Sequence, residues 1–82
     1  MNCKKWNPKK RIYEDYTLPG PTVIFSYEMD RIVHCARCGK KVRYGDAYNS
    51  LQIHNDIGIA YPVCEKCHEK EWKEEREANE SD

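Results

Sequence analysis

The pattern of apolar and polar residues changes character along the chain and divides it into three parts. Residues 1–21 show neither a helical nor a strand period, and four prolines or glycines interrupt them. Residues 22–63 alternate apolar and polar positions in short runs that are typical of strands. From residue 64 onward the chain is built from strong helix formers. The pattern therefore predicts an irregular arm, a β-rich middle and a C-terminal helix.

The first β-rich stretch is predicted to be a hairpin that leads the chain into Cys35. Residues 22–28 are rich in β-branched and aromatic side chains, residues 29–30 suit a turn, and residues 31–34 resume the alternation. Side chains two positions apart share one face of a strand. The face expected to enter the core carries Val23, Phe25 and Tyr27.

A second hairpin is predicted between Val42 and Val63. Apolar residues alternate with polar ones on both sides of Asn55-Asp56, which suits the turn, and Gly58 allows a bulge or a close approach. Pro62 cannot donate a ladder hydrogen bond, so its strand should lie at an edge or have ended there. An exposed edge leaves dimerisation open.

The helix is expected over residues 65–80 and should fray before Ser81. Its apolar face is thin, and Trp72 is expected to pack back toward the preceding hairpin. Favourable charge pairs four residues apart, such as Glu69 with Lys73, support the helix.

Composition limits the size of the core. The chain has 82 residues, of which 39% are hydrophobic and 34% are charged. A chain this short usually needs a staple such as a metal ion. No apolar run is long enough to span a membrane, and no signal peptide is recognisable, so we expect a cytoplasmic protein without a membrane partner.

Two C-x-x-C pairs are the strongest chemical signal. The first reads Cys35-Ala36-Arg37-Cys38-Gly39 and the second Cys64-Glu65-Lys66-Cys67. Outside an oxidising compartment, such pairs are typical of a zinc site with four thiolate ligands. We predict one Zn²⁺ per chain, held by Cys35, Cys38, Cys64 and Cys67, with Gly39 closing a tight turn called a zinc knuckle. Cys3 is expected to be a free thiol.

Other readings of these cysteines are weaker. Cys64-x-x-Cys67-His68 also satisfies the haem c attachment pattern, but attachment needs export and leaves the first pair without a purpose. Four thiolates also bind iron, although rubredoxin-like sequences carry glycine after both pairs. His54-Asn55 is a fragment of an HNH nuclease motif, yet His68 lies too near Cys67 to be the further ligand. A closed thiolate shell leaves no open metal position, so we expect no enzyme.

Charge is unevenly distributed although the formal net charge is zero. The first half is basic and the C-terminal stretch is acidic. We predict three parts: a flexible basic and aromatic arm (1–21), a zinc-binding domain (22–76) and an acidic tail (77–82). Basic residues near aromatic ones can bind single-stranded nucleic acid, or they can simply be solvated. The candidates are Lys4, Lys5, Lys9, Lys10, Arg11, Arg37, Lys40 and Lys41.

The order of knuckle, hairpin and helix with the second cysteine pair resembles a treble-clef zinc finger over residues 35–72. Within that group, Cys35-x-x-Cys38-Gly39 and Cys64-x-x-Cys67 before a charged helix look like the TraR/DksA-type finger. They are also similar to small bacterial and phage treble-clef proteins, including the zinc-binding anti-sigma factor Gin. The resemblance implies a small α+β zinc-stabilised domain, here with an additional N-terminal β-hairpin.

Two functions follow from the sequence. The zero net charge, the acidic exposed helix and the scarcity of catalytic groups favour a protein-interaction module, such as a small regulator of the transcription machinery. The alternative is a zinc finger that binds nucleic acid through its basic front. The sequence favours the protein partner slightly and leaves the oligomeric state open.

Overall fold

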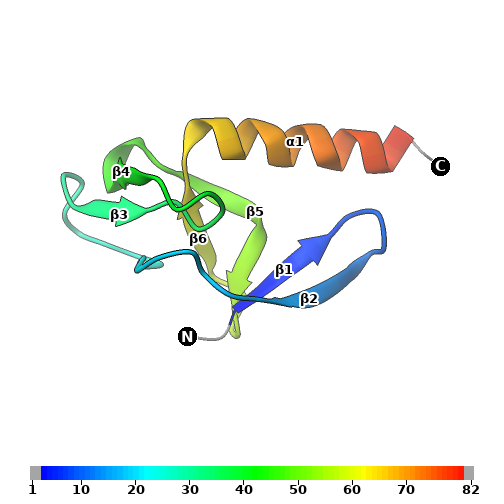
Figure 1. Ribbon diagram of the computed structural model, residues 1–82, viewed down its shortest axis with the longest axis horizontal. Coiled ribbons are helices and arrows are strands. Elements are labelled where there is room, and N and C mark those ends of the chain that lie inside the picture. The colour runs from blue at the N-terminus through cyan, green and yellow to red at the C-terminus, as the bar shows by residue number, and fades with distance from the viewer. Residues whose placement is uncertain (1–2, 81–82) are drawn as a thin grey trace.

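The computed structural model describes residues 3–80, which form one α-helix and two antiparallel sheets. The four-stranded sheet has the order β2-β1-β5-β6, and the two-stranded sheet pairs β3 with β4. In Figure 1, α1 runs along the top, the β1–β2 hairpin points below its C-terminal half, and β3–β4 lies at the opposite end. The elements are β1 (Cys3–Asn7), β2 (Ile12–Tyr16), β3 (Ile32–His34), β4 (Lys41–Arg43), the 3-10 helix η1 (Tyr44–Asp46), β5 (Tyr48–Asn55), β6 (Ala60–Val63) and α1 (Glu65–Glu80).

The expected α+β architecture and C-terminal helix are confirmed. The second hairpin forms over residues 48–63 and not from Val42, because Val42 and Arg43 belong to β4 and pair with β3. Strands β5 and β6 pair antiparallel and are joined by a turn in which the Asn55 side-chain oxygen accepts hydrogen bonds from two backbone amides. Gly58 adopts a positive φ of 88° in this turn. Strand β6, which contains Pro62, is an edge strand of the larger sheet.

The N-terminal segment corrects the expectation of an arm without strands. Residues 3–16 form the β1–β2 hairpin, and β1 also pairs with β5, so this segment is half of the larger sheet. The strand period is hidden because β2 is an edge strand with mostly exposed side chains. Cross-strand pairs fix its register instead, including an ion pair between Lys4 and Asp15. At the turn, the Asn7 side-chain oxygen accepts from the Lys9 and Lys10 amides.

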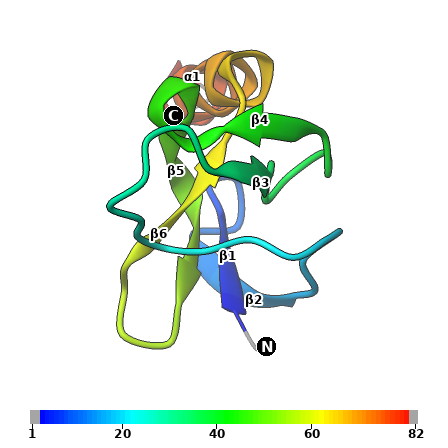
Figure 2. The same ribbon diagram turned by 90° about the vertical axis from the view of Figure 1, so that its left-hand side faces the viewer.

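The first expected hairpin, over residues 22–34, is wrong. Residues 17–31 join neither sheet, and Figure 2 shows this segment in cyan passing from β2 around to β3. The expected core face is also wrong, because Phe25 and Tyr27 are exposed whereas Ser26 is buried and Ile24 packs against the core. High β-propensity reflects a fit to a pleated, half-buried surface, and no neighbouring strand supplies that surface here.

The short hairpin that does form is β3–β4, and the first cysteine pair occupies its tip. Ile32 pairs with Arg43, and His34 pairs with Lys41. The Cys35 amide donates to the Lys40 carbonyl oxygen at 2.7 Å, which closes the tip. The turn that holds Cys35 and Cys38 is therefore carried on a hairpin of its own.

The core and the cysteine cluster are one unit. The buried side chains include the Cys64 and Cys67 thiols together with Ile53, Tyr61 and Val63 from the β5–β6 hairpin. The core has few apolar side chains, so the β5–β6 hairpin packs largely against the cysteines. Anything that holds the cysteines in place therefore also stabilises the position of the hairpin.

Candidate metal centre

The four cysteines of the two C-x-x-C pairs converge in the structure. Cys35 and Cys38 lie at the tip of β3–β4, Cys64 directly precedes α1, and Cys67 lies in its first turn. All four sulfur atoms lie within 4.8 Å of one another, and the Sγ atoms of Cys38 and Cys64 are 3.8 Å apart. A tetrahedral ion with Zn–S bonds of about 2.3 Å separates its sulfurs by about 3.8 Å. The cluster can therefore bind one metal ion, as the spacing predicted.

Cys35 is the cysteine of the cluster whose sulfur accepts three backbone hydrogen bonds. It is fully buried, and its sulfur accepts hydrogen bonds from the backbone amides of Arg37 at 3.4 Å, Cys38 at 3.4 Å and Cys64 at 3.3 Å. Burial alone would raise the pKa of this thiol, but the three amides outweigh burial and lower the pKa to about 7. The backbone is therefore arranged to hold a thiolate at this position.

Cys38 and Cys67 would need a nearby cation to carry a negative charge at neutral pH. Burial raises the pKa of Cys67 far above its ordinary range, and burial also raises the pKa of Cys38. Neighbouring thiols contribute in the same direction at Cys67, because like charges cannot gather without compensation. A bound divalent cation supplies that compensation and displaces the protons.

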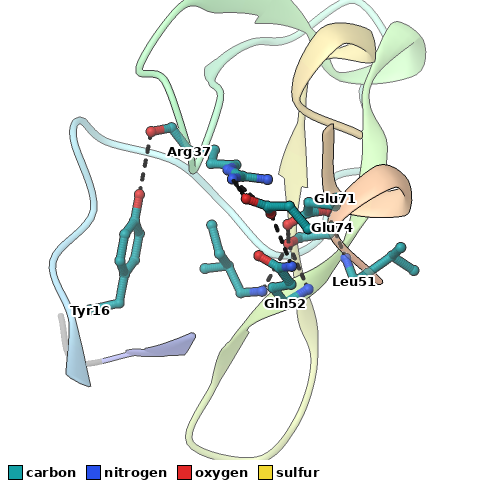
Figure 3. Close-up of polar contacts among 8 residues, drawn as sticks. Tyr16, Arg37, Leu51, Gln52, Glu71 and Glu74 are labelled. Carbon is teal, nitrogen blue, oxygen red and sulfur yellow. Dashed lines mark hydrogen bonds and ion pairs between the residues drawn. The ribbon is translucent and has the colours of Figure 1, made fainter. Parts of the chain in front are cut away.

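The knuckle is braced from two sides. The Tyr16 hydroxyl, on β2, donates to the Ala36 carbonyl oxygen at 2.7 Å (Figure 3). His34 Nδ1 lies 3.0 Å from the carbonyl oxygen of Gly39, whose φ is 80°. The side chain of Pro19 lies close to Gly39, so that any Cβ there would approach Pro19 Cβ to 3.3 Å. His34 thus supports the knuckle and is not one of the clustered ligands.

Arg37 connects the knuckle to the helix. Its Nη2 atom lies 2.9 Å and 3.0 Å from the two carboxylate oxygens of Glu74, and the Gln52 amide donates to the same carboxylate at 3.2 Å (Figure 3). Burial would lower the pKa of Arg37, but the Glu74 carboxylate outweighs it and the pKa is raised. This side chain therefore belongs to the internal packing of the metal-bearing elements.

Glu71 provides a second connection between α1 and β5. Its side chain is fully buried and accepts hydrogen bonds from the Ser50 hydroxyl at 2.6 Å and the Leu51 amide at 2.9 Å (Figure 3). The Ser50 oxygen in turn accepts from the amides of Gln52 and Ile53, where the β5–β6 register shifts. The β5–β6 register shift leaves some donors of β5 without partners in the sheet. The Glu71 carboxylate accepts hydrogen bonds from two of them, the Ser50 hydroxyl and the Leu51 backbone amide.

Sequence reasoning missed these carboxylates, although a signal was present. Positions 64, 67, 71 and 74 follow the spacing of three and four residues that places side chains on one helix face. The cysteines direct this face inward, so Glu71 and Glu74 point to the sheet with them. The spacing of Glu71 and Glu74 from the cysteines was therefore the signal in the sequence that these two carboxylates face the sheet.

His68 and Trp72, also on α1, contact each other and lie outside the cysteine cluster. Trp72 was expected to pack toward the metal and hairpin, but its side chain is 51% exposed. Its indole N–H donates to His68 Nε2 at 3.0 Å, and the His68 ring stacks on Tyr48 with centroids 4.6 Å apart. His68 therefore positions Trp72 and lies outside the cysteine cluster.

Cys3 is a free thiol, as expected, but it does not lie in an arm. It is buried in the core and its sulfur lies 3.1 Å from the carbonyl oxygen of Tyr16. Burial raises the pKa of this thiol. Cys3 therefore acts as a small apolar side chain of the core, contributed by β1.

The candidate nucleic-acid contacts are not brought together. Lys9, Lys10 and Arg11 lie in the β1–β2 turn, whereas Lys40 and Lys41 lie at the β3–β4 hairpin, at the opposite end of the molecule (Figure 1). The molecule is 41 Å long in this direction.

Three other candidates have partners inside the chain. Lys4 forms an ion pair with Asp15, Arg37 binds Glu74, and the Lys5 ammonium lies 5.7 Å from the centre of the Tyr16 ring. The basic front of the sequence is therefore not a continuous basic surface.

Comparison of the chain with protein-family models, with curated proteins and with solved structures finds no significant match in any of the three. Within residues 3–80, the one helix is neither long enough nor apolar enough to cross a membrane. The site is therefore interpreted from its own geometry.

Proposed function

We propose that this chain is a structural zinc-binding domain that acts as a protein-interaction module, without an enzymatic reaction of its own. The observation that carries the metal assignment is the cluster of four sulfurs within 4.8 Å, in which Cys35 accepts three backbone amides. One Zn²⁺ per chain with Cys35, Cys38, Cys64 and Cys67 as ligands suits this donor set. Four thiolates fill the tetrahedral shell and leave no position for a substrate.

The order of elements supports a treble-clef type of domain. A knuckle precedes the β5–β6 hairpin, and the next cysteine pair stands at the start of α1. On this basis we place the chain beside the TraR/DksA-type and small bacterial or phage fingers that the sequence resembles. We further propose that it works in the cytoplasm, where its five free cysteines stay reduced, as a small regulator of transcription machinery.

A protein partner is favoured over nucleic acid by the distribution of charge. Lys4 and Arg37 form ion pairs within the chain, and Lys9, Lys10 and Arg11 in the β1–β2 turn lie at the opposite end from Lys40 and Lys41. Without a continuous basic track, the electrostatic contribution that drives nucleic-acid binding is small.

The test has two measurements on the purified chain. Elemental analysis should find one zinc per chain, and iron, or no metal in a folded sample, would contradict the metal assignment. Capture from a cell lysate should then retain a protein partner after nuclease treatment. A partner that is lost with nuclease, or with moderately raised salt, would instead support the nucleic-acid alternative.

A further inference from the structure

An open groove separates the β1–β2 hairpin from the C-terminal half of α1. Its volume is about 620 Å³, and Trp6, Tyr13, Leu51, Trp72, Glu75 and Asn79 line it. Three of these six side chains are aromatic, and they include both tryptophans of the chain. The lining residues belong to the β1–β2 hairpin, to β5 and to α1, and these elements are labelled in Figure 1.

The three aromatic rings of the groove are held in place by neighbouring side chains. Trp6 and Tyr13 face each other across the β1–β2 ladder with ring centroids 5.0 Å apart. On the opposite wall, Trp72 is held by its hydrogen bond to His68, which is itself stacked on Tyr48. Tyr13 and Trp72 nevertheless remain 56% and 51% exposed. The groove therefore presents ordered aromatic surface that the chain itself does not cover.

The charge of the groove is negative. Glu75 is the one charged residue among the six, and its side chain is partly buried. Within the described part of the chain this carboxylate has no hydrogen bond or ion pair, whereas Glu71 and Glu74 on the same helix are both bonded. A partly buried carboxylate beside aromatic faces attracts a cation, because both the charge and the ring quadrupoles favour it.

We propose that this groove binds an arginine or lysine side chain of the protein partner, with the cation against Trp6, Tyr13 and Trp72 and paired with Glu75. This proposal rests on the proposed function and adds the site and the chemistry of recognition. The flanking Leu51 offers contact to the aliphatic part of the same side chain.

A nucleic-acid base could also stack on these rings, but the charge opposes it. A phosphate entering with the base would meet Glu75 without a lysine or arginine among the lining residues. The neighbouring groove, on the other side of Trp6, is lined by two lysines and two glutamates and adds no net charge. The surroundings therefore favour a cationic ligand over an anionic one.

Tryptophan fluorescence tests the proposal directly, because both tryptophans line the groove. The probes are a capped peptide with two arginines among glycine, serine and leucine, the same peptide with citrulline for arginine, and a short oligothymidylate. Citrulline keeps the shape of arginine and removes its charge. We expect the arginine peptide to change the emission saturably and to bind about tenfold more tightly than the citrulline peptide.

Variants locate the binding. Glu75→Gln and Tyr13→Leu should each weaken the arginine peptide by about threefold to tenfold. Glu69→Gln and Tyr27→Leu, which alter exposed residues outside the groove, should leave it unchanged. Zinc content and helical circular dichroism are measured on each variant, so that loss of the fold is recognised.

Three results would overturn the inference: equal binding of the arginine and citrulline peptides, binding of neither up to millimolar concentration, or a response to oligothymidylate alone. Retention of a lysate protein in equal amounts by the parent and by Glu75→Gln would also overturn it, while leaving the proposed protein-binding function intact. Loss of all nuclease-resistant capture by the parent would instead contradict the proposed function.

Discussion

The Glu71 carboxylate on α1 accepts a hydrogen bond of 2.6 Å from the hydroxyl of Ser50 on β5, and both residues are buried. The chain has 34% charged residues, and α1 carries many glutamates. Glu71 nevertheless is fully buried. It replaces the apolar contact that usually fastens a helix to a sheet with hydrogen bonds to an irregular strand.

Replacing this carboxylate should destabilise the domain. Glu71→Gln offers one acceptor oxygen where two are used and places an amide donor near the Ser50 hydroxyl or the Leu51 amide. Leaving a buried donor without its acceptor costs about 1–3 kcal/mol. Urea unfolding of the metal-loaded protein measures this loss of unfolding free energy.

The exposed Glu69 gives the matched control for this substitution. Glu69→Gln changes the same functional group on the same helix and should alter stability by less than about 0.5 kcal/mol. Equal stability of the two variants would show that the Glu71 hydrogen bonds contribute nothing measurable.

The Arg37–Glu74 pair should contribute to stability in a pH-dependent way. Burial would raise the pKa of Glu74, but the hydrogen bond and charge of Arg37 outweigh it, so the pKa lies below the ordinary value of 4.5. A carboxyl group with a lowered folded-state pKa stabilises the protein fully above its unfolded pKa. That contribution is lost as pH falls through the folded-state pKa.

A double-mutant cycle with Arg37→Met and Glu74→Gln should therefore give a coupling of about 1 kcal/mol at neutral pH. The difference in unfolding free energy between the parent and Glu74→Gln should shrink below pH 4.5. A difference that is constant from neutral to acidic pH would contradict a charged pair at this position.

Metal binding should release protons. Without the metal, the raised pKa values of Cys38 and Cys67 keep both thiols protonated at neutral pH. Zinc ligation requires thiolates, so binding should release at least these two protons and weaken as pH falls. Calorimetric titration of the reduced apoprotein with zinc, in buffers of different ionisation enthalpy, counts them.

Cysteine substitutions distinguish the predicted metal ligands from Cys3, which is buried but lies outside the cluster. Cys64→Ser should abolish stoichiometric zinc binding and unfold the domain, because structural zinc supplies folding free energy directly. Cys3→Ala should retain one zinc per chain and lose only the packing of a small buried side chain. Loss of zinc from Cys3→Ala at native helix content would make Cys3 a ligand, contrary to the geometry.

Gly39→Ala and Gly58→Ala should differ in cost although both glycines have positive φ, at 80° and 88°. Each substitution incurs about 1–2 kcal/mol of backbone strain. At Gly39 the new methyl group also meets Pro19 at 3.3 Å, whereas at Gly58 it meets no atom within 4 Å. Thermal unfolding should therefore show Gly39→Ala as the less stable variant, and the reverse order would contradict the tight packing of the knuckle.

The parts of the fold that carry a local signal could be predicted from the sequence. The cysteine spacing identified the four clustered thiols, Asn55 and Gly58 marked the β5–β6 turn, and the composition of α1 identified the helix. Each signal belongs to the segment that it describes.

The parts that depend on distant partners could not be predicted in this way. Strand β2 has no apolar alternation because its register rests on cross-strand pairs such as Trp6 with Tyr13. Phe25 and Tyr27 look like core residues, but their segment joins neither sheet and both side chains are exposed. The burial of Glu71 follows from a bulge in β5 that only the pairing with β6 creates.

The pairing of β1 with β5 has a consequence for the way the chain is assembled during synthesis. Strand β1 is made before the knuckle and β5 after it, and Cys64 and Cys67 come later still. The inner edge of β1, where Cys3 lies, therefore stays unpaired in the nascent chain until β5 has been translated. Because non-local pairings must wait for distant residues, the sheet closes late and the second half of the metal site arrives last. An ion that binds all four cysteines can therefore be captured only after both paired strands, β1 and β5, have been made.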